Sequence, residues 1–220
     1  MKKTMLLTAG CTLTVLCAMP ALAAEKASGP YMSGHLGIAM PSDTTLTDVT
    51  VPGVSLEVEY DTGLAMGLAL GYKFGPTRLE GEIGYQKNDF DDVTVTVAGV
   101  GSASLKSAGV PFSGDVKTTS FLLNGYYDFT NDSAFTSYLT AGLGLAKVKA
   151  SFDLPSVGYS GSDSDTVFAY QLGAGVEYAL NQTVSLDVRY RYFATSDPSF
   201  DTLDAEFDSH NLMLGAKVKF

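Results

Sequence analysis

Hydrophobic and polar residues alternate with a period of two along most of this chain. The last segment shows the pattern well, because Lys217 and Lys219 occupy one parity and apolar residues the other. The apolar parity of that segment consists of Leu212, Leu214, Ala216, Val218 and Phe220. Such alternation predicts a β-strand with one apolar and one polar face, since successive side chains of a strand point to opposite sides.

Eight segments carry this alternation, and no long helical period interrupts them. The segments cover approximately residues 31–40, 62–74, 78–90, 116–129, 135–149, 166–180, 184–192 and a last stretch that ends at Phe220. Most contain ten or more residues, which is long enough for a tilted strand to cross a bilayer. An even number of strands allows the sheet to close without leaving an edge in lipid.

The connections between these segments alternate between short and long. The short ones are 75–77, 130–134 and 181–183, and the long ones, rich in Gly, Ser, Thr and Asp, are near 41–61, 91–115, 150–165 and 194–206. Short turns at one end and long loops at the other are typical of membrane barrels. The sequence therefore predicts an all-β fold, an eight-stranded antiparallel up-and-down transmembrane β-barrel with short periplasmic turns and long extracellular loops.

The N-terminal residues have the features of an export signal. Lys2 and Lys3 form a basic start, residues 5–19 are mostly apolar, and Ala21-Leu22-Ala23 fits a cleavage site. We expect residues 1–23 to be removed and residues 24–220 to form the outer-membrane barrel domain. Cys11 and Cys17 leave with the signal, so the mature chain has neither a disulfide nor a thiolate metal site.

The charge balance of the mature chain is strongly acidic. Loss of Lys2 and Lys3 reduces the basic residues from 14 to 12, against 24 acidic ones, which gives a net charge of −12. This charge argues against nucleic acid as a partner. It suits a surface that holds divalent cations or repels other anions.

Alternation alone does not decide which face points inward, and an exported lipocalin-like barrel would have an apolar interior. Aromatic residues at the ends of the segments favour the membrane barrel, in which they form girdles at the interfaces. These residues are Tyr72, Phe74, Tyr127, Phe129, Tyr178, Tyr190, Tyr192 and Phe220. We therefore expect the apolar parity to face lipid and the charged parity to face the lumen.

Four short motifs carry a family resemblance. They are residues 31–37 (YMSGHLG), 124–129 (NGYYDF), 138–144 (YLTAGLG) and 186–192 (LDVRYRY). Each is weak alone, but in this order and spacing the chain resembles the OmpA-like, opacity-type outer-membrane β-barrel domain family of Gram-negative bacteria, over essentially its whole mature length. The terminal Phe220 resembles the signal that such proteins present to the outer-membrane assembly machinery. The peptidoglycan-binding domain of full-length OmpA has no counterpart here.

The charged parity predicts a network of ion pairs in the lumen. Its members are Lys73, Arg78, Glu80, Glu82, Asp128, Glu177, Asp187, Arg189, Arg191, Lys217 and Lys219. In a narrow barrel an unpaired charge is costly, so we expect Arg189 and Arg191 to pair across the lumen with acids such as Glu80, Glu82 or Glu177. Such pairing would plug the barrel; the alternative is a small ion path, for which several inward glycines leave room.

The sequence offers few candidates for catalysis. Asp208, Ser209 and His210 invite comparison with a lipid-modifying enzyme, but Ser209 and His210 are adjacent and must point to opposite faces of a strand. His35 belongs to the lumen parity. We predict no catalytic, cofactor-binding or metal-binding residues. The acidic loops are interpreted as a solvated surface, with cations shared with lipopolysaccharide phosphates as the alternative.

These features favour a structural or surface-interaction role, adhesin-like, in the bacterial outer membrane. The alternative is a small-solute or ion channel, and an enzyme that acts on lipid is less well supported. The expected partners are outer-membrane lipids and lipopolysaccharide, the assembly machinery and an extracellular or host ligand. We expect a monomer with both termini in the periplasm.

Overall fold

The fold is described from a computed structural model of the protein. It covers residues 28–48, 53–196, 199–200, 203–204 and 207–220; the predicted signal at residues 1–23 lies outside them. The long strands are β1 (Gly29–Pro41), β4 (Gly63–Phe74), β5 (Thr77–Val97), β7 (Ser113–Phe129), β8 (Phe135–Leu154), β9 (Tyr159–Ala179), β10 (Val184–Thr195) and β13 (Asp208–Lys219). The short elements are β2 (Thr44–Asp48), β3 (Val54–Tyr60), β6 (Gly101–Ser104), β11 (Ser199–Phe200), β12 (Leu203–Asp204) and the 3-10 helix η1 (Pro155–Val157).

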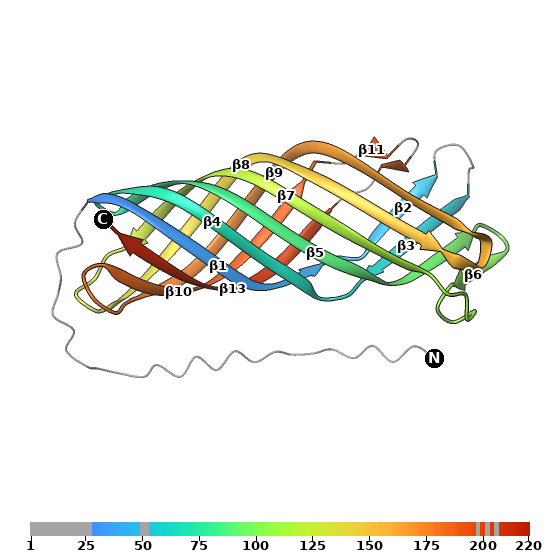
Figure 1. Ribbon diagram of the computed structural model, residues 1–220, viewed down its shortest axis with the longest axis horizontal. Coiled ribbons are helices and arrows are strands. Elements are labelled where there is room, and N and C mark those ends of the chain that lie inside the picture. The colour runs from blue at the N-terminus through green and yellow to red at the C-terminus, as the bar shows by residue number, and fades with distance from the viewer. Residues whose placement is uncertain (1–27, 49–52, 197–198, 201–202, 205–206) are drawn as a thin grey trace.

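The eight long strands form a closed antiparallel ring. Each pairs with the next long strand along the chain, and β1 closes the ring against β13, from Tyr31 opposite Lys219 to Pro41 opposite Ser209. Figure 1 shows the tilted strands wound around one axis. Closure satisfies the backbone hydrogen bonds of every barrel strand internally, which a hydrocarbon surrounding requires. The predicted up-and-down eight-stranded barrel is confirmed. In the described part of the chain, no helix has the length and apolar character needed to span a membrane.

The two faces of the ring follow the alternation in the sequence. Leu68 and Leu70 on β4 point outward and are 69% and 70% exposed, whereas Ala65 and Ala69, on the other parity of the same strand, point inward and are buried. The same division holds for the other barrel strands, and it leaves a continuous apolar outer wall. The inside–outside assignment made from the sequence is therefore confirmed.

The two ends of the barrel differ. At the end called here the short-turn end lie Gly29, Lys219 and the turns between β4 and β5, β7 and β8, and β9 and β10. Gly75 occupies the first of these turns with a φ of +58°, a left-handed conformation that glycine adopts without strain. The opposite end, called the long-hairpin end, carries β2, β3 and β6 (Figure 1).

The stretches predicted as long loops are largely β-structure, which corrects that expectation. The β8–β9 hairpin continues to Leu154 opposite Tyr159, and β5 continues to Val97, where it pairs with β3 and β6. Alternating Val and Thr residues from Val93 to Val97 favour extended backbone. Because strand pairing satisfies the backbone groups of these segments, the sheet extends beyond the closed barrel.

Asp92 anchors the end of β5 beyond the closed barrel. Its carboxylate accepts hydrogen bonds from the Ser104 hydroxyl (2.5 Å) and from the backbone N–H groups of Val93 (2.7 Å) and Lys106 (3.2 Å). These donors, Ser104 first, hold the pKa of Asp92 below its ordinary value. The ionised carboxylate thus joins β5 to the turn that follows β6.

Acidification is expected to loosen this junction only below the ordinary pKa of an aspartate. A carboxyl group whose pKa is lowered by folding contributes stability above its unfolded pKa of about 3.9, and this contribution is lost as the pH falls through the lowered value. An NMR titration of the Asp92 carboxyl carbon should show the lowered pKa. Ser104→Ala removes the largest cause and should raise it; an identical titration in the variant would contradict this account.

Candidate functional site

The inward face of the barrel gathers most of the charged residues predicted for the lumen. The buried members are Lys73, Arg78, Glu80, Glu82, Asp128, Glu177, Arg189, Arg191 and Lys217. The side chain of Asp187 is 9% exposed. Lys219, in contrast, is half-buried at the short-turn end, without an ion pair to any described residue. The alternation of β4, β5, β7, β9, β10 and β13 points the buried side chains inward.

A first cluster lies in the half of the lumen near the short turns. Asp128 on β7 pairs with Lys73 and with Arg78, whose Nη2 lies 2.8 Å from its Oδ1. Arg78 Nη1 also lies 3.7 Å from Glu177 Oε2, and Glu177 pairs with Lys217. Two carboxylates and three cations thus join strands from opposite sides of the ring, so each charge has a partner inside the barrel.

Aromatic rings complete this cluster. The Arg78 guanidinium carbon lies 4.4 Å from the ring centroid of Tyr126 and 4.8 Å from that of Tyr138. A guanidinium held between ring faces gains cation–π attraction where water is excluded. Neither tyrosine was singled out as a site residue from the sequence, although alternation places both on the inward parity.

A second cluster is centred on Glu82 of β5. Its Oε1 lies 2.8 Å from Arg191 Nη1, and its Oε2 lies 3.7 Å from Arg189 Nη1. Asn124 donates to Glu82 Oε2 at 3.0 Å, and Gln171 donates to Asn124 at 2.6 Å. The carboxylate therefore connects β5 with β10 across the lumen and with β7 beside it.

His35 and Asp187 extend the second cluster. Asp187 Oδ1 lies 3.2 Å from His35 Nε2, and Tyr138 donates its hydroxyl to Asp187 Oδ2 at 2.5 Å. Arg189 Nη2 contacts the His35 ring at Nδ1 (3.2 Å). The same Nη2 lies closer still to Nε2, and Arg189 Nε lies 3.4 Å from Asp187 Oδ2, so the imidazole is held between a guanidinium and a carboxylate.

The structure selects one of the three acids that the sequence analysis offered as partners of Arg189 and Arg191. Arg189 and Arg191 both pair with Glu82, as predicted, but Glu177 pairs with Lys217 and Arg78 instead. Glu80 accepts hydrogen bonds from Ser33 (3.2 Å) and the Tyr126 hydroxyl (2.7 Å), with no ion pair to a described residue. Periodicity gives the face of a residue, but its partner depends on strand stagger and rotamers.

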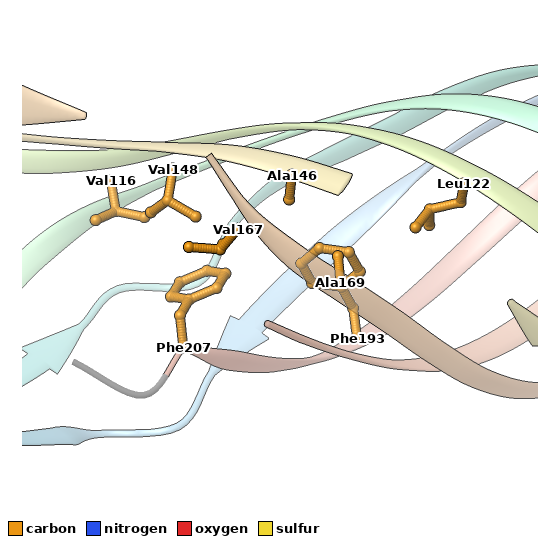
Figure 2. Packing of buried hydrophobic residues seen from close by; sticks show 8 residues of the cluster. All are labelled: Val116, Leu122, Ala146, Val148, Val167, Ala169, Phe193 and Phe207. Carbon is orange, nitrogen blue, oxygen red and sulfur yellow. The ribbon is translucent and has the colours of Figure 1, made fainter. Parts of the chain in front are cut away.

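The half of the lumen near the long hairpins contains an apolar cluster beside buried polar side chains such as Gln86 and Asn88, and the sequence analysis missed this cluster. Figure 2 shows Phe193 and Phe207 among small aliphatic side chains. The buried members of this apolar plug are Val116, Leu122, Ala146, Val148, Val167, Ala169, Phe193 and Phe207. Tyr60 and Phe90 pack against it. A signal was present in the sequence, because the inward parity of β7, β8, β9 and β10 carries apolar residues toward the long hairpins.

Side chains fill the centre of the lumen. A cavity of about 10 Å³, room for about one water molecule, lies among His35, Arg78, Glu177 and Arg189. The ion pairs surround it, and the apolar plug lies toward the long hairpins. This arrangement is suited to holding strands together and offers no wide aqueous path.

Ser209 and His210 point to opposite faces of β13, as expected of neighbours in a strand. Ser209 points inward and donates to Gln86 Oε1 at 3.2 Å, whereas His210 is on the outer wall, with Nδ1 2.6 Å from the Tyr190 hydroxyl. The two side chains therefore do not form a catalytic pair. Among the described residues, no group of three or more His, Cys, Asp or Glu side chains is placed to hold a metal ion.

Phe220 lies just beyond β13. Its backbone N–H donates to the Pro30 carbonyl at 3.1 Å, and its side chain is 72% exposed. The ring thus contributes little to the barrel interior. Its role as an assembly signal stays a prediction.

A closed antiparallel barrel with an apolar outer wall and a charged, ion-paired interior defines an integral outer-membrane β-barrel protein. The chain belongs to the family described as the outer membrane protein beta-barrel domain, whose model matches residues 9–220. The resemblance seen in the sequence motifs is therefore confirmed, and the protein is placed in the outer membrane.

Relatives and solved structures agree with this assignment. The chain is 29% identical over 241 residues to the outer membrane protein PagN of Salmonella typhimurium, covering 96% of this chain and 97% of PagN. It is 30% identical over 167 residues to a Rickettsia conorii protein provisionally named as an adhesin, RC1281, covering 64% and 67% of the two chains. The crystal structure of neisserial surface protein A shares the fold, with a TM-score of 0.55, 24% identity and coverage of 88% and 98%.

Proposed function

We propose that this protein is a surface-interaction protein, adhesin-like, that displays its long hairpins outside the cell on a filled barrel. The observation that carries this proposal is the contrast between the two ends of the molecule. One end has short turns, while the other continues as paired strands beyond the closed ring. In bacterial barrels short turns face the periplasm and long connections face outward, so both termini would be periplasmic.

The interior favours this role over a channel. Ion pairs around Asp128, Glu177 and Glu82 cross the lumen, and the apolar plug lies in the long-hairpin half. A barrel filled in this way can hold its hairpins in fixed positions. The similarity to the adhesin-named relative RC1281 supports the same reading.

Partners and processing complete the proposal. An extracellular or host ligand would bind the hairpins, and outer-membrane lipids with lipopolysaccharide would surround the apolar wall. Export would remove residues 1–23, and Phe220 would be read by the assembly machinery before the monomer folds. We propose no enzymatic activity, because the lumen charges are engaged with one another and Ser209 and His210 point apart.

Shortening one hairpin tests the role of the exposed strands. Ala150 and Asp163 are directly opposite in the β8–β9 pair, so residues 151–162 can be replaced by an Asn-Gly turn. Bacteria that display the shortened protein should keep it in the outer membrane, with heat-modifiable migration on gels. Their binding to a host epithelial layer should fall toward that of cells without the protein.

Planar-bilayer recordings of the purified protein provide the control for the channel alternative. A filled lumen should give no discrete, reproducible openings. Two results together would overturn the proposal in favour of a channel. They are regular openings in the recordings and undiminished cell binding after each hairpin is shortened in turn. Protease added to whole cells should cut the hairpins and spare the short turns.

A further inference from the structure

Four lysines form a row on the outer wall at the hairpin side of the apolar band. Lys87 on β5 is directly opposite Lys117 on β7, and Lys117 is directly opposite Lys149 on β8. Lys147 shares the outward face of β8 with Lys149, two residues away. Neighbouring strands are about 4.8 Å apart, so these ammonium groups share one small patch of surface, the lysine row.

The lysine row is unusual in a chain with a net charge of −10. The other basic side chains of the barrel strands point into the lumen or lie at the short-turn end, as Lys219 does. Lys106 lies in the turn beyond β6 and pairs with Asp91. Among the described residues, the positive charge of the outer wall is therefore confined to three adjacent strands.

The position of the row coincides with the end of the apolar wall. Tyr85 precedes Lys87 on the outward face of β5, and Leu145 precedes Lys147 on β8. Phe121 is the corresponding apolar residue of β7, separated from Lys117 by the outward Thr119. On β10 and β13 the outward residues at this side of the band are instead Tyr190, Tyr192 and His210. The row therefore lies where headgroups begin, on one side of the barrel only.

The lysines are only half neutralised by the protein itself. Lys87 pairs with Asp89 (2.8 Å) and Lys117 with Asp115 (2.9 Å), both on the hairpin side of the row. Lys147 and Lys149 are exposed, with no carboxylate of a described residue within 4.0 Å. Like charges directly opposite each other destabilise a sheet, so an external anion between the lysines would relieve the repulsion.

We propose that the lysine row binds the phosphate groups of lipopolysaccharide in the outer leaflet. The inference rests on the proposed orientation, with the long hairpins outside. A lipid phosphate fits better than a soluble anion, because acyl chains can lie against Phe121, Leu143 and Leu145 while the phosphate meets the ammonium groups above them. Lysines at a membrane surface attract anionic headgroups in this way.

The test compares the double variant Lys147→Gln/Lys149→Gln with the wild-type protein, using fluorescent diphosphorylated lipid A as the probe in zwitterionic micelles. Both lysines are exposed, so the barrel should fold as before. Affinity for lipid A should fall about thirtyfold, the factor expected from the loss of two lysines near a charged surface. Lys106→Gln, which removes a lysine at the hairpin turn, should bind lipid A as the wild type does.

Two ligand controls identify the source of the phosphate. Lipid A without phosphates should bind the wild-type protein weakly. Its affinity should match the affinity of the double variant for diphosphorylated lipid A. Inorganic pyrophosphate should not displace lipid A at equal concentration; if it does, the row is a site for free phosphate. Equal binding by wild type and double variant would overturn the proposal. Heat-modifiable migration and cell binding, measured on the same variants, show separately whether the barrel and its surface role hold.

Discussion

Replacing Glu82 by Gln is expected to destabilise the barrel by about 3–5 kcal/mol, the range for breaking a buried ion pair on one side. The substitution keeps the volume of the side chain but removes the charge that Arg191 and Arg189 share, at 2.8 and 3.7 Å. Arg191 would then remain in a water-poor lumen without its ion pair, and Arg189 would keep only Asp187, at 3.4 Å. The free energy of unfolding is measured with urea in lipid or detergent, with heat-modifiable migration as the reporter.

Asp132→Asn is the matched control. Asp132 is exposed in the turn between β7 and β8, and removing its charge should change the free energy of unfolding by less than about 0.5 kcal/mol. The double variant Glu82→Gln/Arg191→Gln should lose less free energy of unfolding than the two single variants lose together, because the two residues are energetically coupled. A coupling energy near zero would show that the ion pair does not hold the barrel together.

Truncation of Phe193 to Ala is the second change with a large expected effect. Phe193 is 2% exposed and is one of the two aromatic residues of the apolar plug. The lost ring would leave a cavity that the other side chains of the plug, fixed on their strands, cannot fill. A loss of about 3–5 kcal/mol is typical of such truncations in a well-packed core.

Phe121→Ala provides the comparison on the outer wall. Phe121 is 58% exposed on the lipid-facing side of β7, where acyl chains can fill the vacated space. Its truncation should therefore be clearly less destabilising than that of Phe193. Phe193→Ala should also make the long hairpins more sensitive to protease. Equal costs at both positions would contradict the apolar plug as a source of stability.

The sequence by itself determined the barrel, its strand number and its two faces. A side-chain period of two is a local property of extended backbone, so it does not depend on where a strand lies in the fold. In β10, Leu186 and Val188 point outward, whereas Arg189 and Arg191 point inward. Membrane burial required the apolar parity to face lipid. The inward position of His35 and the separation of Ser209 from His210 followed from the same rule.

Only the tertiary structure decided which inward residues meet. Glu80 and Glu82 are two positions apart on one face of β5, yet Glu82 receives two arginines and Glu80 only hydroxyl groups. The stagger of strands around the ring and the reach of each side chain set these partners, and neither is encoded in periodicity. The apolar plug required the same information, since Phe193 and Phe207 come from different segments. The lysine row likewise became visible only when strand register placed Lys87, Lys117 and Lys149 side by side.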